Sequence, residues 1–152
     1  MSVKVPPKGT RGVRFPRFLV RLGSRFTPGM FRRRPSRTSG GIRTLMLETR
    51  GARTGEMRNA ILGYLEDGPD GWLIVGSLLG ASRQPGWMYN LAKDPRGTVE
   101  FYGGERVEVA ARTLHDAERE AAWRRVAVEA PEYTKYLEKT DREIPVVRLQ
   151  RR

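Results

Sequence analysis

The sequence predicts a mainly β fold with a few helices (α+β), a small closed or split barrel of about six antiparallel strands. Three observations carry this prediction. Short apolar or alternating runs recur between residues 45 and 149, with turn residues between them. Residues 67–71 read Asp-Gly-Pro-Asp-Gly, which is a strong turn sequence. Gly103-Gly104 joins two alternating runs, and this predicts a two-residue hairpin.

The elements follow from these patterns in chain order. Pro85 opens a short helix that should stop before Pro95, and Asp116 is a good N-cap for a helix that Pro131 terminates. Residues 76–84 are expected to form a loop. The expected strands are residues 45–47, 60–65, 72–75, 99–102, 106–109 and 146–149.

A basic amphipathic helix is expected from Val13 to Met30, where Pro28-Gly29 should end it. At 100° per residue its apolar side chains share one arc and its arginines share the neighbouring arc. Such a helix suits an anionic membrane surface, or its apolar face packs on the domain or caps a pocket. The apolar arc holds Phe15, Phe18, Leu19, Leu22, Phe26 and Met30, and the basic arc holds Arg14, Arg17, Arg21 and Arg25.

All of the net charge lies in the N-terminal arm. The chain has 29 Lys and Arg against 17 Asp and Glu, a formal +12, and Glu48 is its first acidic residue. We therefore expect three parts: a disordered basic tail (1–12), the helix and a linker (13–42), and a barrel domain (43–152). No cysteine is present, which excludes disulfides and thiolate metal sites.

The expected location is the cytoplasm. No apolar run approaches the ~20 residues of a spanning helix, and the N-terminus lacks the apolar core of a secretory signal. The basic helix is compatible with a peripheral contact between residues 13–37 and the inner face of the plasma membrane.

The turn between the first two strands has the composition of an anion site. Residues 49–62 read TRGARTGEMRNAIL, in which Gly51 and Gly55 tolerate unusual backbone angles. Arg50, Arg53 and Arg58, with the Thr54 hydroxyl, would surround a phosphate or carboxylate. An ordinary solvated hairpin with surface arginines is the alternative.

Three blocks in this order resemble one known family. They are TRGARTGEMRNAIL, VGSLLGASRQPGWMYNLAKDP and YTKYLEKTDREIPVVRL. With the spacing between them, the resemblance covers roughly residues 43–149. The chain is similar to the deazaflavin-dependent nitroreductase family, the A group of the flavin/deazaflavin oxidoreductases. This resemblance implies an FMN-binding-like split β-barrel that uses coenzyme F420, in its reduced form F420H2.

The resemblance also implies a cofactor site. The anionic tail would be bound by Arg53, Thr54 and Arg58. The backbone at Ala60, Ile61 and Leu62 would border the deazaflavin ring, and Ser77, Leu78, Leu79, Gly80 and Ala81 would close over it. Trp87 and Asn90 would buttress the pocket, although Trp87 is equally suited to core packing.

The chain departs from the family pattern at several of these positions. Ala52 stands where a second basic residue is usual, and Ile61 and Leu79 also depart. The missing cation should weaken binding of the tail, unless Arg50 or Arg83 compensates.

The implied reaction transfers a hydride from reduced deazaflavin to a two-electron acceptor, a quinone, an activated enone or a nitro-compound. Tyr133 and Tyr136 match family tyrosines near the substrate, and at i and i+3 they would share a helix face. They would donate a proton or a hydrogen bond to the acceptor, or only shape the pocket. A monomer or homodimer is expected.

Two other functions stay open from the residues. A non-catalytic split barrel that binds a lipid or fatty acid is favoured by Ala52 and the Leu78-Leu79 pair. A nucleic-acid-binding arm is disfavoured, because it lacks interleaved stacking aromatics on a strand surface. His115 is expected at the surface and Asp141-Arg142 as a structural ion pair, and the sequence shows no metal site.

Overall fold

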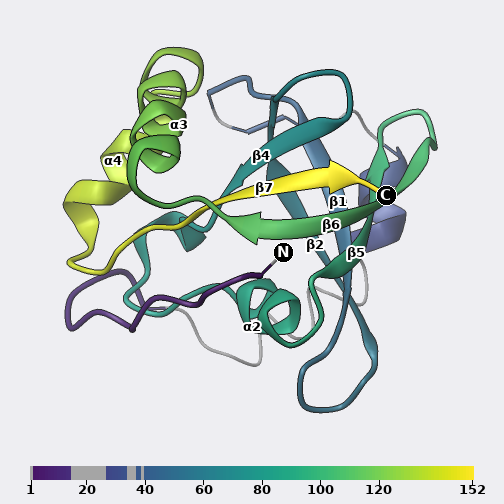
Figure 1. Cartoon of the computed structure of the whole chain (residues 1–152), viewed down its shortest axis with the longest axis horizontal. Helices are drawn as coiled ribbons and strands as arrows, with labels where there is room; N and C mark the ends of the chain where they lie inside the picture. Colours follow the sequence, from purple (N-terminus) through teal and green to yellow (C-terminus); the bar gives the residue numbers. More distant parts are fainter. Residues whose placement is uncertain (1, 15–26, 34–36, 39) are drawn as a thin grey trace.

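The computed structural model describes residues 2–14, 27–33, 37–38 and 40–152. Within them, seven strands form one antiparallel sheet in the order β2-β1-β5-β6-β7-β4-β3, which curls into a half-barrel (Figure 1). This confirms the expected α+β split barrel. The strands are β1 (Thr44–Arg50), β2 (Met57–Gly63), β3 (Leu65–Glu66), β4 (Gly71–Val75), β5 (Arg96–Phe101), β6 (Arg106–Thr113) and β7 (Val146–Arg151).

The expected strand over residues 60–65 is in fact two strands that meet at Tyr64. β2 pairs with β1 along its whole length, whereas β3 pairs with β4. At the junction the Tyr64 N–H donates to the Arg43 carbonyl, 3.1 Å away. The chain therefore changes its strand partner at this point, so that β2 and β3 lie at the two ends of the sheet order.

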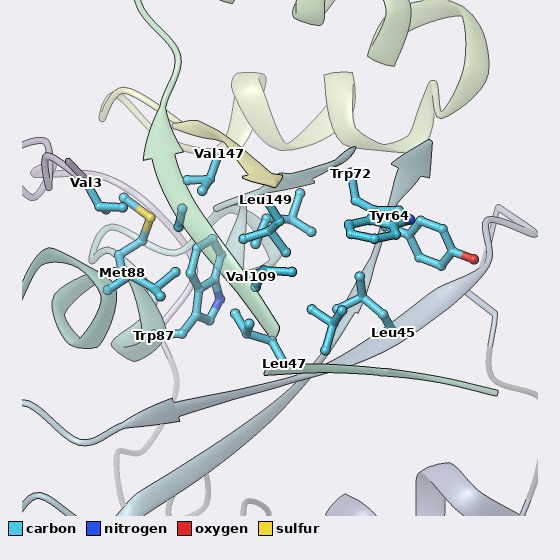
Figure 2. Close-up of a cluster of buried hydrophobic side chains, with 14 of the residues drawn as sticks. Val3, Leu45, Leu47, Tyr64, Trp72, Trp87, Met88, Val109, Val147 and Leu149 are labelled. Atoms are coloured by element: carbon cyan, nitrogen blue, oxygen red, sulfur yellow. The ribbon is translucent and has the colours of Figure 1, made fainter. Parts of the chain in front are cut away.

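Alternation along the strands builds the main core inside the curled sheet. Leu45 and Leu47 of β1 and Val109 of β6 are fully buried there, and Trp72 and Trp87 pack into the same cluster (Figure 2). Side chains that point to the other face of β4 and β7 form a second cluster under α3 and α4. Burial on both faces explains why β4 is apolar at every position after Gly71.

Three helices begin or end beside the prolines that the sequence analysis singled out. α2 (Gly86–Lys93) begins after Pro85, and α3 (Asp116–Glu129) ends before Pro131, as expected. α4 (Glu132–Lys139) follows at once and packs beside α3 (Figure 1). The N-cap prediction was wrong, because the N-cap residue is His115 and it makes no side-chain cap bond.

The β5–β6 hairpin also differs from the prediction. β5 ends at Phe101 and β6 begins at Arg106, so residues 102–105 form the connection instead of the two glycines alone. The Phe101 N–H donates to the Glu105 carbonyl at 2.9 Å, which closes the wider turn. Gly103 and Gly104 keep the positive φ angles, 104° and 95°, that made them turn residues.

The N-terminal residues are not the disordered tail that the composition predicts. Residues 2–14, here called the N-terminal strap, run extended along the barrel (Figure 1). Val3 is only 6% exposed within the main core, and the Lys4 N–H donates to the Thr113 hydroxyl at 2.9 Å. Backbone hydrogen bonds and one buried valine thus offset the polar composition of this segment.

The described part of the predicted basic helix packs on the barrel. Residues 27–33 are helical, so Pro28-Gly29 lies within a helix and does not end it. Phe31 is 1% exposed, whereas Met30, expected on the apolar face, is 66% exposed. Arg32 forms a bidentate pair with buried Glu100 of β5, at 2.9 and 3.0 Å, and this pair fixes the segment. The remaining predicted face, residues 15–26, lies outside the described residues.

Candidate functional site

A single large cavity of about 800 Å³ collects nearly all of the residues that the sequence nominates. It lies between β2, the turn before β2, the start of α2, α4 and the short 3-10 turn η1 (Leu78–Gly80). The nominated residues that line it are Arg53, Thr54, Arg58, Ala60, Ile61, Leu62, Ser77, Leu78, Leu79, Trp87, Asn90, Tyr133 and Tyr136.

One end of the cavity is formed by residues 51–56, here called the arginine turn. The Gly51 N–H donates to the Glu56 carbonyl at 2.7 Å, and the Gly55 N–H donates to the Gly51 carbonyl at 2.9 Å. Gly55 has a φ of 73°, which explains why glycine stands there. The turn is therefore closed by bonds within itself, and its side chains are free to face outward.

The arginines in and beside this turn differ in their surroundings. Arg53 is exposed at the cavity, and Arg58 is half-buried and pairs with Glu56 at 3.2 Å. Arg50 does not line the cavity, because its guanidinium donates back to the Gly55 carbonyl at 3.1 Å. Arg83 does not line the cavity either.

Helix α2 holds the arginine turn and adds a cation that sequence reasoning missed. The Asn90 side chain accepts from the Ala52 N–H at 2.9 Å and donates to the Thr49 hydroxyl at 3.0 Å. One turn later, the Lys93 ammonium donates to the Ala52 carbonyl at 2.8 Å. Lys93 thus places positive charge beside Ala52, where the family pattern has a basic residue. Its i+3 spacing from Asn90 is the sequence feature that could have revealed it.

The middle of the cavity is apolar. Ala60, Ile61 and Leu62 of β2 are half-buried and form one wall. Trp87 is 7% exposed, and it both packs in the main core and lines the cavity, so its two expected roles coincide. Such a wall suits the flat ring of a heteroaromatic ligand.

Residues 76–82, here called the leucine loop, form the opposite side. Leu78 and Leu79 have φ angles of 39° and 53°, a region that costs energy for branched side chains, and Leu79 is 52% exposed at the cavity. Gly80 and Ala81 were expected to line the site, but they lie behind its wall. Gly80 packs on α4, where a Cβ would come within 2.8 Å of Lys139, and Ala81 is 1% exposed.

Tyr133 and Tyr136 share a face of α4 as expected, with ring centroids 6.0 Å apart. Tyr133 is 8% exposed, and its hydroxyl lies against the Gly63 backbone at the end of β2. Burial raises the pKa of both phenols above the ordinary value, and the negative charge of Glu132 adds to the effect. Both side chains are therefore protonated, hydrogen-bond-donating phenols at neutral pH.

Asp141 and Arg142 do not form the expected ion pair. Asp141 accepts hydrogen bonds from the backbone of Thr10 and Arg11, whereas the Arg142 guanidinium is buried and reaches the leucine loop. Burial lowers the pKa of Arg142 to about 10, which leaves it cationic at neutral pH. His115 is exposed, as predicted. The part of the chain described here holds no His, Cys, Asp or Glu cluster suited to a metal ion, and no helix with the length and apolar character to cross a membrane.

Comparison with known proteins finds relatives that cover most of this chain. A family model described as F420H(2)-dependent quinone reductase matches residues 25–151. An F420H(2)-dependent quinone reductase of Mycobacterium tuberculosis is 38% identical over 137 residues, which cover 88% of this chain and 91% of that protein. A solved structure of an F420-H2 dependent reductase (FDR-A) is 30% identical with a TM-score of 0.62, covering 70% of this chain and 93% of that one. Another, described as a domain-swapped dimer, is 27% identical with a TM-score of 0.63, covering 90% and 100%.

Proposed function

Because this chain belongs to the F420H(2)-dependent quinone reductase family, we propose that it uses F420H2 to reduce a quinone. The cavity is the observation that carries the assignment. It joins a cationic end, an apolar wall and two phenols in one volume of about 800 Å³. An activated enone or a nitro-compound is a further two-electron acceptor that such a site would take.

The residues fit the cofactor at each part of the cavity. F420 bears a phosphate and carboxylates on its tail, and Arg53, the Thr54 hydroxyl and Arg58 offer donors for these groups at one end. The apolar wall of β2 and Trp87 suits the deazaflavin ring. Lys93 contributes a further positive charge next to Ala52, outside the cavity lining. Lys93 would therefore replace the positive charge that the family pattern has at position 52.

The protein's part in the reaction is to orient and to protonate. When bound, reduced F420 supplies a hydride from C5 of its deazaflavin ring. A quinone that takes up this hydride and one proton becomes the hydroquinone. The walls of the cavity would hold the acceptor close to the deazaflavin ring. Tyr133 and Tyr136 hold the proton at their phenolic oxygens, and their raised pKa keeps it there well above neutral pH.

We assign the proton-donating role to Tyr136 and a supporting role to Tyr133. Tyr133 is the more buried of the two, and its hydroxyl is held against Gly63 at the end of β2. Tyr136 is half-buried and lines the cavity with less cover. Tyr136→Phe should lower kcat for quinone reduction about tenfold or more with little change in cofactor affinity. If the loss of activity in Tyr136→Phe came entirely from weaker cofactor binding, with kcat unchanged, this assignment would be contradicted.

A titration of the protein with oxidised F420, followed by fluorescence, tests the function. We expect saturable micromolar binding that is lost in the Arg53→Ala/Arg58→Ala double variant. Arg124→Ala is the control, because Arg124 is an exposed arginine of α3 that does not line the cavity. Turnover of a water-soluble naphthoquinone with F420H2 would then be measured. Failure of folded wild-type protein to bind F420 would contradict the proposal and favour the lipid-binding alternative.

We also propose that the protein touches the membrane from the cytoplasmic side, through its basic arm. The formal charge of +12 lies before Glu48, and Met30 in this arm is 66% exposed. An anionic surface would attract such a segment, and a lipid-soluble quinone would then reach the cavity directly. Co-sedimentation with anionic but not zwitterionic vesicles, abolished by high salt, is the expected result. Absence of binding to both kinds of vesicle would contradict the contact. The monomer or homodimer expectation stays a prediction.

A further inference from the structure

The leucine loop is held almost entirely by groups from other parts of the chain. Outside the short turn η1, the carbonyl groups of this loop lie in neither helix nor strand and must find partners elsewhere. Among the residues that the structure describes, only Leu78 and Ser77 accept from within the loop, through the Ala81 and Gly80 N–H groups at 3.0 and 2.8 Å. The other bonds to its carbonyls come from two distant sources, Arg142 and the N-terminal strap.

Arg142 binds the loop from the inside. Its guanidinium donates to the carbonyls of Gly76, Ser77 and Ala81 at 3.0, 2.7 and 2.7 Å. A further bond reaches the Gln84 side-chain oxygen at 3.0 Å. These acceptors stand on both sides of Leu78 and Leu79. One planar side chain therefore bridges the base of the strained turn and holds its two ends together.

The N-terminal strap binds the same loop from the outside. The Gly9 N–H donates to the Ser82 carbonyl at 2.7 Å, and the Val13 N–H donates to the Gly80 carbonyl at 3.0 Å. The approach is close enough that a Cβ on Gly12 would collide with the backbone nitrogen of Ser82. The strap therefore requires glycine where it crosses the loop.

Asp141 joins these two supports. Its carboxylate accepts from the Thr10 and Arg11 N–H groups at 2.9 and 3.0 Å and from the Thr10 hydroxyl. The neighbouring Thr140 hydroxyl donates to the Arg11 carbonyl at 2.8 Å. Asp141 thus fixes the strap while Arg142, the next residue, fixes the loop. Both follow α4, which carries Tyr133 and Tyr136.

We propose that Asp141, Arg142 and the N-terminal strap are positioning residues that hold the leucine loop in the shape that closes the cavity. They touch neither cofactor nor acceptor, since none of them lines the cavity. The segment that composition marks as a disordered tail thereby determines how well the site binds its ligand. The inference rests on the proposed function, because the ligand in question is F420.

Asp141→Ala tests the proposal without a large effect on folding. Asp141 is exposed, so its removal should release the strap and leave the core intact. Amide hydrogen exchange at Gly80 and Ala81 should become about tenfold faster. The dissociation constant for oxidised F420 should rise about three- to tenfold. Gly12→Ala, which displaces the strap by collision, should have the same two effects.

Asp70→Ala is the matched control. Asp70 is an exposed aspartate that pairs with Arg151 at 2.9 Å, and it does not line the cavity. It should change neither exchange at residues 80 and 81 nor F420 affinity. Unchanged exchange in both Asp141→Ala and Gly12→Ala would overturn the proposal, whether or not the protein binds F420. Faster exchange with unchanged F420 affinity would overturn it too, whereas absence of F420 binding by wild-type protein would overturn the proposed function.

Discussion

The arginine turn and the leucine loop border the same cavity, but their backbones are closed in different ways. The arginine turn is closed by hydrogen bonds between residues at most five positions apart, and Gly51 and Gly55 are placed to allow this. The leucine loop depends on Arg142 and the strap, which lie more than 60 residues away in either direction. The backbone of the first is therefore closed locally, with added bonds from Asn90 and Lys93 of α2 to Ala52, whereas the second is a product of the fold. The comparison teaches that a cofactor site can join parts with very different sensitivity to remote change.

The largest expected effect follows removal of the Arg142 guanidinium. Arg142→Met should lower the free energy of unfolding by about 3 kcal/mol, because several buried carbonyls would lose their donor. Chemical denaturation measures this change. Arg53→Ala, in the arginine turn, should stay within about 0.5 kcal/mol of wild type, since Arg53 is exposed. Similar losses in both variants would mean that the two segments are supported alike.

Alanine at a positive-φ glycine in each segment sharpens the comparison. Gly55 and Gly80 have φ angles of 73° and 82°, so the backbone penalty is about 1 kcal/mol in both. Gly55 has open space around it, whereas a Cβ at Gly80 would lie 2.8 Å from Lys139 Cβ. Gly80→Ala should therefore cost about 2 kcal/mol and Gly55→Ala about 1 kcal/mol in thermal unfolding. The reverse order would contradict the packing of the leucine loop against α4.

Lys93→Ala tests the cation beside Ala52. F420 affinity should fall about two- to fivefold at low ionic strength and by less at high salt, since an exposed charge is screened. Binding of the deazaflavin riboside, which lacks the phosphate and the carboxylates, should not change. Lys135→Ala is the control, an exposed lysine of α4 that does not line the cavity. An equal loss for the riboside would show that Lys93 acts only by holding the Ala52 carbonyl.

The smallest expected effect is the loss of the stabilising contact between Asp141 and the strap at acid pH. Hydrogen bonds from the Thr10 hydroxyl and the Arg11 N–H lower the pKa of Asp141 from 3.8 to about 2. The unfolded carboxyl binds its proton more tightly, so the strap contact contributes its full stability above about pH 4. This contribution is lost as the pH falls through about 2. The amide resonances of Thr10 and Arg11 should therefore titrate near pH 2, and a midpoint at the ordinary value would contradict the contact.

The sequence alone determined the fold class, the family and most of the cavity lining. These depend on local patterns: alternation within strands, glycines at turns, prolines at helix ends, and motifs of adjacent residues. Arg53, Thr54 and Arg58 were found because they stand close together in the chain, and Tyr133 and Tyr136 because they stand on one helix. The division of the second strand at Tyr64 escaped this reasoning, because a change of strand partner leaves no mark in alternation.

Only the tertiary structure decided what supports the site. The sequence placed Gly80 and Ala81 in the cavity, treated Asp141 and Arg142 as an ion pair and left the strap disordered. The structure differs from each of these predictions for the same reason. The partners of Arg142 lie about 60 residues before it, and those of Asp141 about 130 residues before it. Residue type and spacing report on neighbours along the chain, whereas a buried guanidinium takes whichever carbonyl groups the folded chain brings within reach.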